Sequence, residues 1–237
     1  MPDNTLYERV KSELNRIYGD VRALRTNQHV FWEVQRMIHE NPNLRKPSTF
    51  YGWMGQMYVG TMTATIRRLI DTRRDTVSFV RLLEQIKADL SCFSRAAYKS
   101  RCTNQHLPDG YVDADYDSLV GKGKQQPDKQ KIDDDISELK RRTEILKIFV
   151  DERIAHSAVE QEQELPKFQD LDDAIDYLEE ILKWYNHLIT GAVVSNLLPS
   201  WLYDWKEIFH YPWIQDIADN EVSSSTVPST GLASGCS

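Results

Sequence analysis

The chain has 237 residues, of which 41% are hydrophobic and 27% charged, and its formal net charge is −7. This is the composition of a globular protein, so it excludes wholesale disorder, collagen-like repetition and a disulfide scaffold. The acidic balance also argues against a basic coat protein for nucleic acid. No apolar run approaches the roughly 18 residues that a membrane span needs, so we expect no membrane segment. The odd set Cys92, Cys102 and Cys236 predicts free thiols and a cytoplasmic protein.

Apolar residues in the first third of the chain recur at helical spacing. A helix is predicted from Leu6 to about Gly19, and a second from Val21 to Asn41–Pro42, since proline disfavours helical geometry in the residue before it. Residues 49–70 carry aromatic and Met side chains nearly all the way round. That pattern is typical of a buried central helix.

The remaining segments complete a helical pattern. Helices are predicted from Asp75 or Thr76 to about Cys102, over 132–157 and over 171–188, whereas residues 103–131 are rich in Gly, Pro, Asp and Lys, typical of a long surface loop or insertion. The aromatic stretch up to Ile217 should pack back on the helices. We predict an all-α bundle of five or more helices in one domain over 1–218, with a disordered tail over 219–237.

One segment, RRLIDTRRDTVSFVR, holds five arginines and two aspartates, a local balance of +3. Either this is a solvated helix face with its turn, or it is a patch that faces phosphate, because guanidinium forks match phosphate oxygens. The candidate anion-binding residues are Arg67, Arg68, Arg73 and Arg74, together with Arg142 on a later helix.

Most enzyme signatures are absent. The chain has no phosphate-binding GxxxxGK[ST], no GxSxG and no HExxH, and its six histidines lack the spacing of metal ligands. We therefore expect neither a metal nor a cofactor.

The end of the 132–157 helix, ILKIFVDERIAHSA, differs from a plain core face. At 100° per residue a narrow stripe contains Arg142, Ile145, Phe149, Arg153 and His156. Arg153 and His156 are three residues apart and hence neighbours on one face. The alternative is that the histidine caps the helix C-terminus, where the helix dipole favours a cation.

The string ERIAHS at the end of a long amphipathic helix resembles the signature of the HEPN domains. The stretches RRLIDTRRDTVSFVRLLEQI and DWKEIFHYPWI are similar to the AbiU-type branch of that superfamily, which is linked to bacterial abortive infection. The resemblance spans about Leu6 to Ile217. It implies a helical bundle that dimerises, and it implies a metal-independent ribonuclease of the toxin or phage-defence type.

The family motif is an Arg, a spacer of roughly four to six residues, and a His. His156 matches the histidine, but Phe149, Val150 and Asp151 stand where the Arg would be. Arg153 and Arg142 lie on the same face without holding that position.

Two hypotheses follow. In the first, a homodimer cleaves RNA, with His156 moving a proton and Arg153 stabilising charge on the phosphoryl group. In the second, the chain is a non-catalytic helical module that binds a nucleotide, an antitoxin or a defence partner protein.

Overall fold

The computed structural model describes residues 4–102, 107–151 and 166–213, and in these ranges it has seven α-helices and no strand. The prediction of an all-α fold with at least five helices is therefore confirmed. The chain divides into two compact units, Met1–Leu198 and Pro199–Ser237, and each is described by itself. The single domain predicted over 1–218 stays a prediction, and the tail 219–237 lies outside the described residues.

Helix α1 is one continuous helix, Asn4–Glu40, so the predicted break near Gly19 is wrong. Apolar side chains keep a spacing of three or four residues through Gly19, and the buried positions on both sides are Val10, Leu14, Ile17, Val21 and Leu24. A glycine inside a helix costs only about 1 kcal/mol relative to alanine. The burial of this continuous stripe outweighs that cost. The helix ends directly before Asn41–Pro42, as predicted.

Helix α2, Thr49–Leu69, starts at the N-cap Ser48, whose side chain accepts a hydrogen bond from the Phe50 N–H. The prediction that this helix is buried nearly all the way round is wrong. Its buried side chains lie on one face, at Tyr58, Met62, Thr63, Ile66 and Leu69. Aromatic residues of the first half of the helix are exposed instead, including Phe50 and Trp53.

The helix predicted from Asp75 or Thr76 to Cys102 is interrupted. Helix α3 covers Phe79–Ala88, a short 3₁₀ turn covers Leu90–Phe93, and α4 covers Arg95–Cys102. The break falls at Asp89, whose side chain accepts a hydrogen bond from the Ser91 N–H and so caps the 3₁₀ turn. Ser78 caps α3 at its start by accepting a hydrogen bond from the Arg81 N–H at 3.2 Å.

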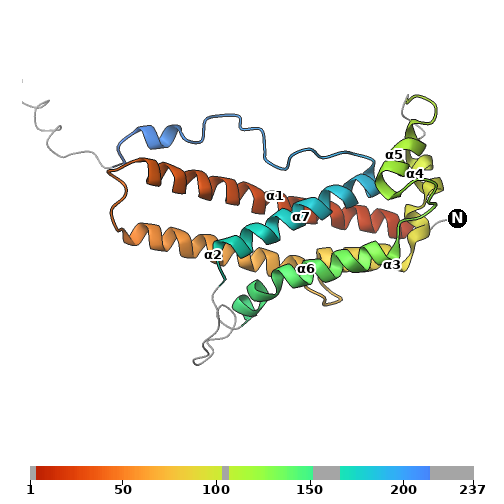
Figure 1. The fold of residues 1–237 in the computed structure, drawn as a ribbon, viewed down its shortest axis with the longest axis horizontal. Coiled ribbons are helices and arrows are strands. Elements are labelled where there is room, and N and C mark those ends of the chain that lie inside the picture. Colours follow the sequence, from red (N-terminus) through yellow and green to blue (C-terminus); the bar gives the residue numbers. More distant parts are fainter. Residues whose placement is uncertain (1–3, 103–106, 152–165, 214–237) are drawn as a thin grey trace, which may run out of the picture. The chain divides into compact units, whose positions relative to one another are not determined.

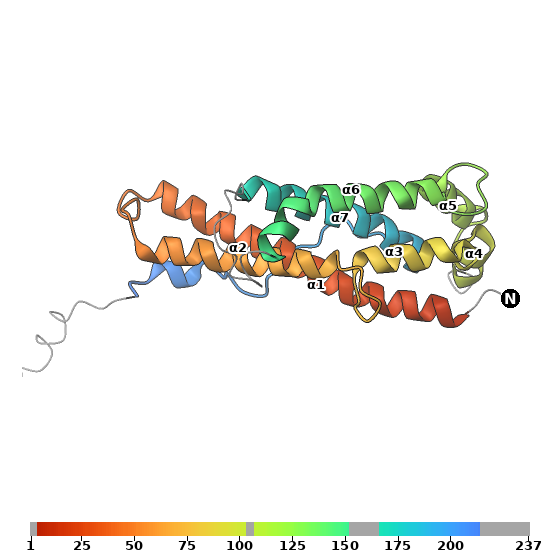
Figure 2. The same ribbon diagram turned by 90° about the horizontal axis from the view of Figure 1, so that it is seen from below.

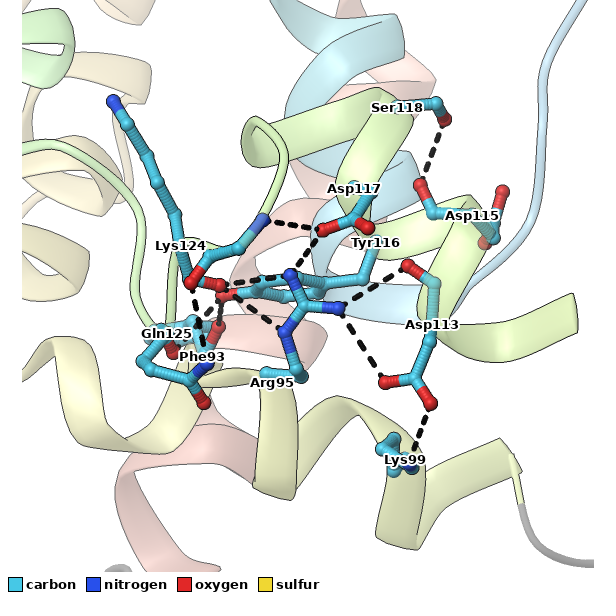
Figure 3. Close-up of polar contacts among 11 residues, drawn as sticks. Phe93, Arg95, Lys99, Asp113, Asp115, Tyr116, Asp117, Ser118, Lys124 and Gln125 are labelled. Atoms are coloured by element: carbon cyan, nitrogen blue, oxygen red, sulfur yellow. Dashed lines mark hydrogen bonds and ion pairs between the residues drawn. The ribbon is translucent and has the colours of Figure 1, made fainter. Parts of the chain in front are cut away.

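The predicted long surface loop over 103–131 needs correction. This stretch contains helix α5, Tyr111–Val120, with a fully buried Tyr116, and it contains the start of α6. Arg95 on α4 organises it, because its guanidinium lies 4.8 Å from the Tyr116 ring centroid and donates to Asp117 and to the Lys124 carbonyl (Figure 3). The Tyr116 hydroxyl donates in turn to the Phe93 carbonyl at 3.0 Å. The polar residues of the segment therefore belong to a network of hydrogen bonds and ion pairs around the buried ring of Tyr116.

Helices α6, Lys129–Phe149, and α7, Phe168–Thr190, form an antiparallel pair. Helix α6 starts three residues before the predicted Ile132, because Asp128 caps it by accepting from the Gln130 N–H at 2.9 Å. Asp135 of α6 is buried and accepts a hydrogen bond from the Tyr185 hydroxyl of α7 at 2.8 Å.

The first unit is a bundle whose helices alternate in direction. In Figures 1 and 2, α1 runs in one direction, and α2 and then α3 run in the opposite direction beside it. Helix α6 runs in the direction of α1, and α7 runs back again. Helices α4 and α5 cover one end. This topology brings the C-terminal end of α2 against the C-terminal half of α6, although the two are separated by about 80 residues in sequence.

In the second unit, aromatic rings follow one another at a spacing of four residues. The ring centroids of Trp201 and Trp205, of Trp205 and Phe209, and of Phe209 and Trp213 lie 5.9, 6.3 and 5.7 Å apart. That this segment packs on the helices stays a prediction. Among the described residues, no helix combines the length and the apolarity that a membrane crossing requires.

Candidate functional site

A pocket of about 560 Å³ opens where the end of α2, the following turn, α1 and the end of α6 meet. It is referred to below as the arginine pocket, and its lining residues are Arg16, Asp20, Ala64, Arg67, Arg68, Asp71, Arg73, Thr76, Val77 and Asp151. Four guanidinium groups and three carboxylates thus surround one cavity, which leaves a net charge of +1. Three of the five arginines that the sequence singled out as anion-binding candidates line it.

Each of those three arginines is held by one aspartate. Arg67 donates from Nε to Oδ1 of Asp151 at 2.8 Å, and Arg68 donates from Nη2 to Oδ1 of Asp20, also at 2.8 Å. The Arg68 side chain is 56% exposed, so its guanidinium still faces water. The carboxylates orient the forks, because each aspartate engages only some of the five donors of its guanidinium.

The turn after α2 is built around Asp71. This buried carboxylate accepts from the Arg73 backbone N–H and from Arg73 Nε, each at 2.9 Å. Burial alone raises the pKa of Asp71, but the two hydrogen bonds from Arg73 and the charges of Arg73 and Arg67 outweigh it, so the pKa is lowered. The Ser78 hydroxyl donates to the Asp71 carbonyl, which ties the turn to the start of α3. Asp71 is therefore an anion at neutral pH that fixes Arg73 at the pocket wall.

Arg16 is the fourth arginine of the pocket, and the sequence analysis missed it. It lies on α1, exposed, and among the residues that the structure describes it makes no ion pair. Its neighbour one turn along the helix, Asp20, is engaged by Arg68. No local sequence signal links Arg16 to residues 67–81, because only the packing of α1 on α2 brings them together.

The two other predicted anion-binding residues lie elsewhere. Arg74 is exposed in the turn and does not line the arginine pocket. Arg142 lines a separate groove of about 600 Å³ between α6 and the start of α7, with Glu144, Asp170 and Asp173 among its neighbours. Its guanidinium donates to Glu138 at 2.6 Å and lies 4.9 Å from the Tyr177 ring centroid. Carboxylates outnumber arginines in that groove, which is unfavourable for phosphate.

The predicted catalytic pair, Arg153 and His156, lies outside the described residues. Asp151 is the last described residue before the ERIAHS string, and it lines the arginine pocket. Of the predicted stripe, Ile145 packs partly buried against the core and Phe149 is half-buried. Across the described ranges, no three His, Cys, Asp or Glu side chains gather in a way that could hold a metal ion.

A family model described as AbiU2, within the HEPN class, matches residues 7–210 of this chain. No curated protein and no solved structure matches the chain. The family match runs from the first turns of α1 through the arginine pocket and past the end of α7, well over half of the sequence. The chain therefore belongs to the AbiU2 family of HEPN proteins, as its three sequence stretches predict.

Proposed function

We propose that this AbiU2 protein is a defence effector that binds RNA at the arginine pocket and cleaves it without a metal, with His156 as the proton-transfer group. The observation that carries the proposal is the contact between Arg67 and Asp151 at 2.8 Å. It holds the residue that directly precedes the ERIAHS string against a cluster of guanidinium groups. His156 follows Asp151 by five residues, so peptide connectivity keeps it within about 18 Å of the pocket wall.

The chemistry requires two kinds of group. One must take the proton of the ribose 2′-hydroxyl or give one to the leaving 5′-oxygen, and an imidazole with an ordinary pKa near 6.5 is suited to that. The other must stabilise negative charge on the phosphoryl oxygens, which arginine does well because its fork can contact two of them. Arg153 is our candidate for this contact at the reacting phosphate. The pocket arginines hold the neighbouring phosphates.

The alternative function is a non-catalytic module that binds a nucleotide or a partner protein, such as an antitoxin. Two observations favour it. Phe149, Val150 and Asp151 stand where the family motif has its Arg, and three of the four pocket arginines are already neutralised by aspartates. We expect weak cleavage at best for this reason.

We further propose a homodimer in which the stripe from Arg142 to His156 forms part of the interface. The half-buried Phe149 supports this, since it is a large apolar side chain outside the main core cluster. A cytoplasmic location is supported by the odd set of three cysteines, Cys92, Cys102 and Cys236, which contains no CxxC pair.

The test is incubation of the purified full chain with mixed RNA in the presence of a chelator. Wild type is compared with His156→Ala, and with His39→Ala, which removes an exposed histidine at the far end of α1. We expect cleavage that survives chelation, is lost in His156→Ala and is retained in His39→Ala. Cleavage that persists in His156→Ala overturns the catalytic assignment. RNA binding without any cleavage by wild type supports the alternative module.

A further inference from the structure

The exposed face of α2 carries an aromatic stripe that leads to the arginine pocket. Phe50, Trp53 and Met57 are 50%, 54% and 52% exposed. At 100° per residue they share one side of the helix with Gly60 and Ala64, and Ala64 itself lines the pocket. We call these five residues the α2 track. The track begins at the rings of Phe50 and Trp53, continues over Met57, Gly60 and Ala64, and ends beside Arg67 and Arg68.

The middle of this track is open at Gly60. A Cβ added at Gly60 meets nothing within 4 Å, and the same holds for Gly52 and Gly55 near the two rings. These glycines therefore do not serve close packing against another helix. The rings of Phe50 and Trp53 lie beside each other, with centroids 5.7 Å apart and planes inclined by 32°, and each residue is about half exposed.

The charge of α2 indicates what fits on the track. In a chain of net charge −7, this helix of 21 residues has no Asp or Glu, and its only charged residues are Arg67 and Arg68. Arg45 and Lys46 precede its N-cap. A helix face with exposed aromatic rings at one end, cations near both ends and no carboxylate of its own is complementary to a strand that carries planar bases and phosphates.

A second copy of the chain fits this face less well. A stable dimer interface needs about 800 Å² of buried surface on each partner. The track offers only three large apolar side chains for that purpose.

We propose that the α2 track binds single-stranded RNA, with unpaired bases stacked on Phe50 and Trp53 and the phosphates leading toward Arg67 and Arg68. This rests on the proposed function, and it names the substrate class as single-stranded. From Trp53 to Arg67 the helix rises about 21 Å, which corresponds to about six nucleotides of a stacked strand. The small side chains in the middle leave room for the sugar–phosphate backbone between the two ends.

The test measures binding of fluorescent oligouridine of four and ten nucleotides, and of a ten-base-pair RNA duplex, to the full chain. The variants are Phe50→Ala, Trp53→Ala, Trp53→Phe and the double substitution Arg67→Ala/Arg68→Ala. Tyr111→Ala is the matched control, because Tyr111 is 52% exposed but lies among aspartates at the start of α5. Circular dichroism checks that each variant keeps its helices.

We expect the ten-nucleotide strand to bind more tightly than the four-nucleotide strand. Trp53→Ala should weaken binding of the longer strand by at least about fivefold, the lower end for a lost base stack, and Trp53→Phe should restore most of it. Tyr111→Ala should change nothing. Duplex binding should be insensitive to Trp53→Ala, since paired bases are not free to stack on a side chain.

Three results overturn the α2 track. If Phe50→Ala and Trp53→Ala bind like wild type while the double arginine variant does not, the proposed function stands without the track. If the aromatic variants change the oligomeric state in solution but not the affinity for RNA, the face is a protein interface. If the wild type binds none of the oligonucleotides, both the track and the RNA-binding function fall.

Discussion

Arg67 on α2 and Asp151, two residues after the end of α6, lie 84 positions apart in sequence and are joined by a hydrogen-bonded ion pair of 2.8 Å. The pair fixes the last described residue before the ERIAHS string against the wall of the arginine pocket. Both side chains are partly exposed, at 27% and 41%. An ion pair of that exposure contributes at most about 1 kcal/mol to stability, so its main consequence is the placement of charge and of the chain that follows.

Asp151→Asn should therefore separate affinity from cleavage. Removing the carboxylate frees the charge of Arg67 and raises the net charge of the pocket from +1 to +2, so the affinity for single-stranded RNA should rise at low salt. The rate of any RNA cleavage should fall, because the ion pair with Arg67 no longer holds the residue that precedes the ERIAHS string. The free energy of unfolding should change by less than about 1 kcal/mol. Binding titrations, cleavage assays and urea unfolding measure the three quantities. Equal affinity and equal cleavage would mean that the pair has no part in function.

The pH dependence of stability should contain a contribution from Asp71. Its pKa in the folded chain lies below the ordinary value of 3.8, because the hydrogen bonds and charges of Arg73 and Arg67 outweigh burial. A lowered pKa means that the ionised carboxylate stabilises the folded state. That stabilisation is complete well above pH 3.8 and is lost as the pH falls through the folded pKa.

Asp71→Asn isolates this contribution, since asparagine can still accept the Arg73 N–H. Urea unfolding of wild type and variant between pH 7 and pH 3 should give a difference that is constant above about pH 5 and shrinks below it. A difference that stays constant down to pH 3 would contradict the assignment of the lowered pKa to this residue.

Phe149→Asp tests the proposed dimer. Phe149 is half-buried at the end of α6 and lies outside the main core cluster, so a charge there should disrupt an interface more than the fold. We expect monomers by light scattering, with the helical signal retained. Ile145→Asp is the informative comparison, because Ile145 packs against the core. If Phe149→Asp unfolds the protein as readily as Ile145→Asp does, the stripe belongs to the interior.

The apolar spacing predicted the fold class, and Asn41–Pro42 predicted the end of α1, because helical spacing and the effect of proline are local to each segment. It did not predict that α1 continues through Gly19, since there the long-range packing of Val21 and Leu24 overrides a local glycine. It also missed α5, because the Asp residues around Tyr116 suggested a loop. Their function as partners of Arg95 depends on a residue some 20 positions away.

The candidate site was predictable in part for the same reason. Arg67, Arg68 and Arg73 are close in sequence, and a turn keeps them close in space. Arg142 shares the predicted stripe with His156, yet α6 directs it into a different groove. Arg16 joins the pocket only through the packing of α1 against α2. The charge pattern of one segment therefore identified the patch, and the tertiary fold selected which of its arginines line the pocket.

Arg16→Ala is the sharpest test of the arginine pocket, because Arg16 makes no ion pair among the described residues and so has no structural partner to leave unpaired. The free energy of unfolding should change by less than about 0.5 kcal/mol, as is usual for an exposed site. If Arg16 contacts one phosphate of a single strand, the slope of log affinity against log salt should become less steep by about 0.7. Arg22→Ala removes an exposed arginine from the same helix outside the pocket, and it should leave that slope unchanged. Equal slopes for wild type, Arg16→Ala and Arg22→Ala would show that RNA does not use this pocket, whatever its affinity for the rest of the chain.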